Sequence, residues 1–418
     1  MKLVDVAEFY TLTGGGVRTY IDQKMAIGAS LGHDVVVIAP GAEHRVEQRP
    51  GGRVIWVPAQ TLIADKNYRL FWNFDHIHAI LDAEKPDVVE ASSPWTAAWI
   101  VSAWKGDAAK AHFLHSDPIA AYPYRWFAGL LSEDTIDRLF FFFWAQLRAL
   151  DRRFDRMVVS GTWLQQRMMK YGMRRPAVAP LGVDVSAFDP ALRDPALRRE
   201  MLAACGMGED AMLFIGMGRH HPEKRWPSLM RATVPEGLAK PIGLFLIGDG
   251  VDRAGVEKAA AKHPHVHVAG RINARGEIAR MLASADGLIH GSGSETFGLA
   301  VAEALASGVP LVVPDTGGTA EMGRPEFAEF YRSGDRKGAR AAVIRFQARD
   351  REAMSLEAAK AGHALGTARD HFTKLFQIYA ELSRDYKAGC LRPRRRGSTQ
   401  RVVAPEVPVD EEGLYRPA

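Results

Sequence analysis

The sequence predicts an α/β protein built from two doubly wound halves. Short apolar runs such as Leu3–Ala7 and Val35–Ala39 alternate with helix-length segments, which is the pattern of a parallel sheet covered by helices. A glycine-rich turn, Gly14 to Gly16, follows the first of these runs. The 418 residues are enough for two substantial cores.

The same alternation gives the order of the elements and the domain limits. Further strands of the first half are expected at Val54–Pro58, Val88–Ala91, Ala111–Leu114 and Met157–Val159. The second half repeats the pattern at Met212–Gly216, Gly243–Gly248, Val266–Ala269, Gly287–His290 and Leu311–Pro314. We therefore expect domains over 1–185 and 206–365, joined by a Pro-, Asp- and Ala-rich linker over 186–205. Residues 366–390 are expected to form a helix, and 391–418 a disordered tail.

Charge, cysteine content and the lack of long apolar segments indicate where the protein works and which partners it has. The net charge of +5 is mild and is concentrated near the C-terminus, and we expect no nucleic-acid partner. Two cysteines suit a reducing cytosol rather than a disulfide framework. The N-terminus lacks the apolar segment of a secretory signal, and no run of about 18 apolar residues occurs. These features predict a cytoplasmic protein, either free or peripheral on the inner face of the cell membrane.

Glu295 and Glu303 stand eight positions apart in the segment His290–Pro310. Small residues precede Phe297, and Phe297–Ala306 carries a helical apolar pattern. Eight residues are a little over two turns, so a glutamate before the helix and one inside it can share a face. A helix N-terminus behind glycines suits phosphate, and carboxylates suit sugar hydroxyls. The segment predicts a nucleotide-sugar site; the alternative is two acids on a solvated helix face.

A basic loop follows a predicted strand at Gly216–Lys224 and contains Arg219. Arginine offers a planar fork and lysine a mobile point charge, and both suit a diphosphate. A departing nucleoside diphosphate gains negative charge in the transition state, so fixed cations lower the barrier. The alternative is a surface loop with ordinary basic residues.

The glutamate pair resembles the E-x7-E element of the retaining GT-B glycosyltransferases called group 1 or family 4. A Gly-Gly-x-x-Glu stretch stands downstream in that family, and Gly317, Gly318 and Glu321 match it. The resemblance covers most of the chain and implies a GT-B fold, in which two Rossmann-like domains face a cleft. The helix over 366–390 would cross back to the N-terminal domain. The N-terminal domain would hold the acceptor, and the C-terminal domain the nucleotide-sugar.

The resemblance also implies roles for single residues of the C-terminal domain. Glu303 would bind the donor's ribose hydroxyls, and Glu295 would contact sugar hydroxyls near the reacting carbon. The amides around Gly298 and Leu299 would hold the diphosphate. Family enzymes carry an Arg and a Lys at the spacing of Arg219 and Lys224, which would stabilise the leaving group.

In the N-terminal domain the resemblance points to the glycine turn and one histidine. Gly15 and Gly16 match a glycine pair that lets the backbone approach the donor phosphate and the acceptor. A histidine at the place of His115 commonly contacts the donor sugar in this family, and Asp117 stands nearby. A histidine at a strand end can instead simply pack or cap.

The reaction expected from the resemblance is transfer of a hexosyl group, with retention, from a UDP- or GDP-linked sugar to a hydroxyl of a glycan or lipid-linked acceptor. The sequence has no Asp-x-Asp pair and no His/Cys metal spacing, so we expect no metal and no cofactor. Two alternatives stay open. One is a GT-B phosphorylase or nucleotide-sugar epimerase, and the other is a catalytically silent nucleotide-sugar-binding protein.

An unusually aromatic segment lies in the first half, over 122–144, and four arginines follow it. It is typical of a core helix with a basic outer face. The alternative is a surface that binds an anionic membrane or holds a lipid-linked acceptor. The arginine-rich tail could assist such binding, although such tails are usually only solvated.

Overall fold

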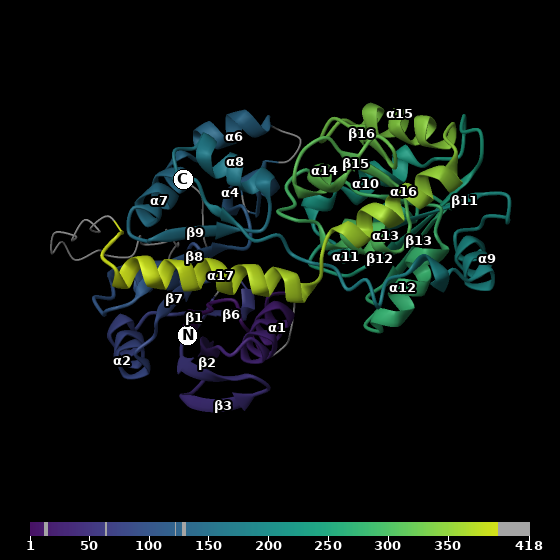
Figure 1. Cartoon of the computed structure of the whole chain (residues 1–418). Coiled ribbons are helices and arrows are strands. Elements are labelled where there is room, and N and C mark those ends of the chain that lie inside the picture. Colours follow the sequence, from purple (N-terminus) through teal and green to yellow (C-terminus); the bar gives the residue numbers. More distant parts are fainter. Residues whose placement is uncertain (12–15, 63–64, 122, 128–130, 392–418) are drawn as a thin grey trace.

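The computed structural model describes residues 1–11, 16–62, 65–121, 123–127 and 131–391. Figure 1 shows two lobes, each built on one central sheet covered by helices. The prediction of two doubly wound, Rossmann-like α/β domains is confirmed. The predicted tail lies outside the described residues apart from Leu391, and so does Gly15.

The first sheet has eight strands in the order β10-β9-β8-β7-β1-β2-β4-β3. All neighbours are parallel except β3, which pairs with β4 in the antiparallel sense. Because the chain leaves β1 first toward β2 and later toward β7, the switch in strand order falls between β1 and β7. The bounds are β1 Lys2–Val6, β2 Asp34–Gly41, β3 Arg45–Arg49, β4 Gly52–Pro58, β7 Val88–Ala91, β8 Ala109–Leu114, β9 Arg156–Val159 and β10 Ala177–Val178, with a separate ribbon of β5 Gln60–Leu62 and β6 Asp65–Leu70.

Eight helices connect the strands of the first domain among the described residues. They are α1 Gly16–Ser30, α2 Phe74–Glu84, α3 Thr96–Ala103, α4 Pro118–Ala121, α5 Pro123–Trp126, α6 Glu133–Leu139, α7 Phe141–Asp151 and α8 Thr162–Lys170. Helix α1 packs on one face of the sheet, and α2 and α3 pack on the other. The Val- and Ile-rich strand β2 is buried over seven of its eight residues because both faces are covered.

The second sheet has six parallel strands in the order β13-β12-β11-β14-β15-β16. Its switch in strand order falls between β11 and β14, and ligands of open α/β sheets bind at such points. The strands are β11 Met212–Met217, β12 Ile242–Ile247, β13 Val266–Gly270, β14 Gly287–Ile289, β15 Leu311–Pro314 and β16 Ala328–Tyr331. The helices are α9 Pro195–Ala204, α10 Trp226–Ala232, α11 Arg253–Ala260, α12 Arg275–Ser284, α13 Leu299–Ala306, α14 Gly318–Met322, α15 Arg336–Gln347 and α16 Arg351–Ala364, with short 3-10 helices η1 Pro190–Leu192 and η2 Pro222–Lys224.

The segment 186–205, expected as a linker, is structured and belongs to the second core. It contains η1 and α9, and Met201 and Leu202 of α9 are buried there. Asp194 caps α9 by accepting from the N–H groups of Ala196 and Leu197. Apolar residues make up about half of the segment, and Met201 and Leu202 on one face of α9 are buried, which is why it folds against the domain.

The two chain crossings between the domains touch each other. The first crossing passes through Gly182 and Val183, and the second through Gly366 and Thr367. Val183 N–H donates to Gly366 O at 3.0 Å. A Cβ on Gly182 would lie 2.0 Å from the carbonyl carbon of Thr367, so only glycine fits there.

Helix α17, Ala368–Lys387, returns to the first domain and lies along its sheet, drawn in yellow in Figure 1. A capping box between Thr367 and Asp370 starts the helix. Its apolar face packs on the β-sheet and α1 through Phe372, Leu375, Phe376, Tyr379 and Leu382. The first core is therefore completed by residues that follow the second domain in the chain.

A buried polar network joins α17 to the first sheet. Lys24 Nζ donates to Asp5 Oδ2 at 2.5 Å and to Glu90 Oε1 at 2.9 Å, and all three side chains are fully buried. Tyr379 OH of α17 donates to Glu90 Oε2 at 2.9 Å. Because one cation faces two carboxylates in the core, its loss would leave uncompensated buried charge.

We expect Lys24→Met to lower the free energy of unfolding by about 3–5 kcal/mol, because Asp5 and Glu90 lose their cation. Lys360→Met is the matched control, since Lys360 forms an exposed pair with Glu357 that is worth about 1 kcal/mol or less. Urea unfolding followed by circular dichroism measures both. Equal, small losses in the two variants would contradict a structural role for the buried network.

Candidate active site

The candidate site lies at the switch point of the second sheet. Strands β11 and β14 are paired neighbours, so the loops at their carboxyl ends emerge side by side. One loop contains η2 with Lys224, and the other runs from His290 to Gly298. Both face the first domain, whose α5 contacts η2.

Lys224 and Glu295 meet in this site. Lys224 Nζ donates to Glu295 Oε1 and lies 3.3 Å from His290 Nε2. Lys224 and His290 are buried, and Glu295 is partly buried. Burial by itself raises the pKa of Glu295, but the Lys224 charge and the hydrogen bonds from His290 and Lys224 together outweigh it and hold that pKa well below its ordinary value. Glu295 is therefore an ionised hydrogen-bond acceptor at neutral pH.

His290 completes this cluster as a neutral group. Burial lowers the pKa of its imidazole, and the adjacent Lys224 charge lowers it further. His290 Nε2 lies 3.6 Å from Glu295 Oε1. From the sequence, His290 was expected only at the end of a strand, with no role in the site. Its one signal was its position at the carboxyl end of a predicted strand, directly before the glycine loop.

Arg219 occupies a different position from Lys224 although both belong to the same loop. Its side chain is 73% exposed and lies 3.6 Å from Glu223 Oε1. Lys224 is instead committed to Glu295. The expected pair of diphosphate cations is thus divided: Arg219 is free to move toward an anion, whereas Lys224 fixes a carboxylate.

Helix α13 points its N-terminus into the same loop. Its N-cap is Gly298, at φ +93°, and no side chain of the described residues caps the first turn. A Cβ on Gly298 would lie 2.8 Å from Thr319 Cγ2, so glycine is required for both conformation and space. Leu299, the first helical residue, is exposed. Uncapped amides at the positive end of a helix dipole form a site for phosphate.

Glu303 lies in the second turn of α13 and differs from Glu295 electrostatically. Burial raises its pKa to about 7, and the nearest cation, Arg275, is 3.9 Å away and only partly opposes this. Arg275 also lies 4.0 Å from Asp184, next to the first crossing between the domains. The sequence does not single out Arg275, because it is one of three charged residues on helix α12 and nothing local to it indicates that it lies beside Glu303.

His115 follows strand β8 and touches the second domain through its backbone. Thr296 Oγ1 donates to His115 O at 3.0 Å. The imidazole packs against the Tyr20 ring at 4.8 Å, and its Nε2 has no hydrogen-bond partner among the described residues. Burial lowers its pKa far below the ordinary value, with Lys24 adding to the effect. The ring is neutral, and the structure joins His115 to the Glu295 loop.

The glycine turn is only partly described. Gly16 is the exposed first residue of α1, and Gly15 lies outside the described residues. Tyr20 of the same helix reaches His115, so α1 brings the turn and the histidine to one end of the first sheet.

The aromatic segment is partly buried in the core and partly exposed on the surface, the two alternatives that the sequence left open. Trp144, Leu147 and Leu150 of α7 are buried in the first domain. At the start of the same helix, Phe141 is 66% exposed and Phe142 50% exposed. The core interpretation thus holds for one face of α7, while its N-terminal end presents aromatic rings to the surface.

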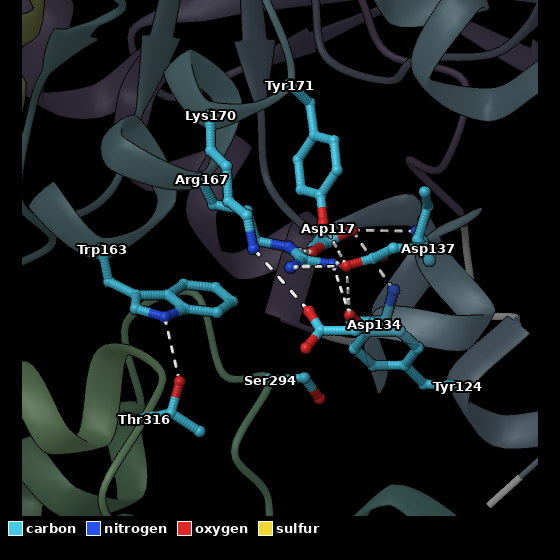
Figure 2. A network of polar contacts seen from close by, with 12 residues as sticks. Asp117, Tyr124, Asp134, Asp137, Trp163, Arg167, Lys170, Tyr171, Ser294 and Thr316 are labelled. Atoms are coloured by element: carbon cyan, nitrogen blue, oxygen red, sulfur yellow. Dashed lines mark hydrogen bonds and ion pairs between the residues drawn. The ribbon is translucent and has the colours of Figure 1, made fainter. Parts of the chain in front are cut away.

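Asp117 serves the first domain rather than His115. Its Oδ1 accepts from the N–H of Ile119 at 2.9 Å, and its Oδ2 accepts from Arg167 Nε. Figure 2 shows this carboxylate in a network on Arg167 that also contains Tyr124 and Asp137. The expected support of Asp117 for His115 is absent from these contacts.

Among the described residues, no group of three or more His, Cys, Asp or Glu side chains could hold a metal ion. No helix within the same residues is both long and apolar enough to cross a membrane.

Comparisons with known proteins agree with the fold. The family described as Glycosyltransferase Family 4 matches residues 14–187, and the one described as Glycosyl transferases group 1 matches residues 209–348. A GDP-mannose-dependent alpha-mannosyltransferase of Mycobacterium tuberculosis is 30% identical over 78% of this chain and 82% of its own length. A GDP-mannose-dependent alpha-(1-6)-phosphatidylinositol dimannoside mannosyltransferase of that species is 29% identical over 77% of this chain and 81% of its own length.

Solved structures show the same architecture at lower identity. Sucrose-phosphate synthase from Thermosynechococcus elongatus aligns with a TM-score of 0.72 at 18% identity, covering 91% of this chain and 99% of its own. HepE of Anabaena, solved with UDP and glucose, aligns with a TM-score of 0.65 at 16% identity, covering 92% and 99%. These likenesses establish the two-domain fold.

The raised pKa of Glu303 predicts a pH-dependent stability effect. Since its pKa is about 7 in the folded protein and about 4.5 in an unfolded chain, the folded state binds the proton first as pH falls. The ionised carboxylate therefore destabilises the fold above pH 7, and the penalty vanishes toward pH 4.5. We expect Glu303→Gln to raise the free energy of unfolding at pH 8 by roughly 1–3 kcal/mol and to leave it unchanged at pH 4.

Urea unfolding at the two pH values measures this difference. Glu381→Gln is the control, because Glu381 is exposed on α17 and should change stability at neither pH. A gain that is equal at pH 8 and pH 4 would contradict the assignment.

Proposed function

Because the chain belongs to the group 1, family 4 glycosyltransferases of GT-B fold, we propose that it transfers a mannosyl group from GDP-mannose to a hydroxyl of a lipid-linked acceptor, with retention. The observation that carries this proposal is the Lys224–Glu295 pair in front of the uncapped N-terminus of α13. Such an arrangement offers a fixed anion to sugar hydroxyls and a positive helix end to phosphate. The donor follows two relatives whose names state GDP-mannose dependence.

In the proposed donor complex, the diphosphate binds at the amides around Gly298 and Leu299. Arg219, exposed and only loosely paired, turns toward the phosphate oxygens. Charge builds on the leaving diphosphate as the glycosidic bond breaks, so a guanidinium and a helix dipole held there lower the barrier. Together these groups meet the charge without a metal, and metal independence is part of the proposal.

The sugar and the ribose are held by the two glutamates. Glu295, kept ionised by Lys224, accepts hydrogen bonds from sugar hydroxyls near the reacting carbon. Glu303 accepts from the ribose hydroxyls, and the neutral His115 approaches the sugar from the first domain. With no side chain assigned as a nucleophile, the acceptor hydroxyl attacks from the face that the diphosphate leaves, and the departing phosphate takes the acceptor's proton.

The acceptor is proposed to reach the first domain from a membrane surface. The exposed Phe141 and Phe142 at the start of α7 give the apolar contact, and Arg138 on α6 stands close to them in the chain. Aromatic and basic groups together suit an anionic lipid surface. One relative acts on a phosphatidylinositol dimannoside, which is a lipid-linked sugar of this kind.

A nucleotide-binding experiment tests the donor. GDP and GDP-mannose should raise the melting temperature by several degrees, since a ligand at about 100 times its Kd adds about 2.7 kcal/mol. UDP and ADP should give smaller shifts, and Glu303→Ala should remove the GDP shift. A larger shift with UDP than with GDP would mean that the donor base is uracil rather than guanine. No shift with any nucleotide would contradict the proposed donor site.

A kinetic experiment tests the leaving-group role of Arg219. Arg219→Ala should lower kcat about 100-fold while the KM for donor changes little, because the charge it meets develops in the transition state. Arg231→Ala, at an exposed position of α10, is the control. Unchanged kcat would exclude this role, and loss of activity in EDTA would exclude metal independence.

The same assay separates the rival functions. A transferase releases GDP only when an acceptor is present and forms a glycosylated product. An epimerase converts the donor without that product, and a phosphorylase consumes a glycan and inorganic phosphate and releases no GDP. A silent binding protein shows a shift in melting temperature without turnover.

Membrane binding can be measured by co-sedimentation with anionic liposomes. The double change Phe141→Ser and Phe142→Ser should lower the bound fraction about tenfold, because two aromatic rings lose their contact with the bilayer. Leu356→Ser is the control, since Leu356 is 58% exposed on α16 of the other domain. No binding by the wild-type protein at low salt would rule out the proposed surface.

A further inference from the structure

Helix α8 of the first domain is capped by a carboxylate of the second domain. Glu321 Oε1 accepts from Thr162 N at 2.9 Å, and Glu321 Oε2 accepts from Trp163 N at 3.0 Å. Thr162 Oγ1 also donates to Glu321. The N-cap residue of α8 is Gly161, which has no side chain to do this itself. One residue of α14 thus satisfies free amides of a helix about 159 positions away.

Space at this contact is limited. A Cβ on Gly161 would lie 2.8 Å from Glu321 Oε2 and 3.1 Å from Thr296 O. A serine, threonine or aspartate at the N-cap would therefore collide with the second domain. Gly161 and Glu321 are complementary. Gly161 leaves space at the N-terminus of α8, and Glu321 fills it and accepts hydrogen bonds from the free amides.

The neighbouring interdomain bonds involve the loops of the proposed donor site. Ser160 Oγ donates to Thr296 O at 3.3 Å, and Thr296 Oγ1 donates to His115 O at 3.0 Å. Trp163 Nε1 donates to Thr316 Oγ1 at 3.2 Å, as Figure 2 shows. Thr296 is next to Glu295 in the chain, so these bonds fix the position of Glu295, the proposed sugar-binding residue, relative to the first domain.

One turn further along α8, Arg167 lies on the same face as Trp163 and joins the helix to other elements of the first domain. Arg167 donates to Tyr124 OH at 2.7 Å and to Asp137 Oδ1 at 3.0 Å, and it pairs with Asp117 (Figure 2). These three partners come from α5, α6 and the start of α4. Helix α8 therefore connects the second-domain carboxylate at its N-terminus with the segment α4–α6 of the first domain.

We propose that Glu321 is a positioning residue, which holds the two domains in the arrangement needed for transfer by capping α8 across the cleft. It acts through α8 and the Thr296 loop and does not touch the donor. When the domains separate, water satisfies both the carboxylate and the amides, so the cap favours closure without locking it. The inference rests on the proposed function for its kinetic consequence only, because the contact between the domains is formed by the chain's own residues.

The test compares Glu321→Ala with Glu326→Ala, an exposed glutamate of the same domain. Small-angle scattering of the full chain should show a larger radius of gyration for Glu321→Ala than for wild type, and no change for Glu326→Ala. The kcat of Glu321→Ala should fall about tenfold, the value of one charge-assisted hydrogen bond, with the Kd for GDP unchanged. Thr162→Val, which keeps the two backbone bonds, should lie between wild type and Glu321→Ala.

Three results would overturn the proposal. They are an unchanged scattering curve, an unchanged kcat, and a weakened Kd for GDP, which would make Glu321 a donor-binding residue instead. If Glu321→Ala does not fold, Glu321→Gln keeps the size and one acceptor and should show the same effects at smaller amplitude. Scattering needs no turnover, so a wild-type protein that transfers no sugar would refute the proposed function while the closure test still decides the role of Glu321.

Discussion

The Lys224–Glu295 pair is the interaction on which the organisation of the site depends. It forms only because β11 and β14 are neighbours, so that loops some 70 residues apart in sequence emerge together. It also needs the lysine to run past Gly218, where a Cβ would lie 3.1 Å from its Cε. A partly buried carboxylate would otherwise be driven toward its neutral form. The pair keeps Glu295 an anion of fixed position before any ligand arrives.

The two glutamates show how one short segment produces opposite electrostatic states. Glu295 has a lysine in contact and stays ionised, whereas Glu303, in the second turn of the following helix α13, has only the partly exposed Arg275 at 3.9 Å and a raised pKa. In the proposed donor complex, hydroxyl donors would relieve the energetic penalty at Glu303, because they would solvate the carboxylate that burial has deprived of water. On this proposal Glu295 is held in place before the donor binds, whereas Glu303 is well solvated only in the complex.

Much of this could be predicted from the sequence, because the signals were local. The alternation of apolar runs and helices gave both sheets, and the glycines before Leu299 marked the uncapped helix. Contacts between distant segments could not be predicted in the same way. Nothing local to Lys224 indicates that it binds Glu295 rather than phosphate, since that contact follows from strand order. The segment 186–205 was misjudged by composition, although Asp194 followed by Pro195 is a typical helix start.

The return of α17 to the first domain imposes an order on synthesis. The first sheet leaves the ribosome early, but the face that Phe372, Phe376 and Tyr379 cover remains open until the whole second domain has been made. The buried network of Lys24, Asp5 and Glu90 likewise lacks its hydrogen bond from the Tyr379 hydroxyl until then. The second domain, whose strands and helices are contiguous in the chain, can fold first. A released chain truncated before residue 368 would therefore present a folded C-terminal half beside an N-terminal half with a bare apolar face, which is a substrate for chaperones.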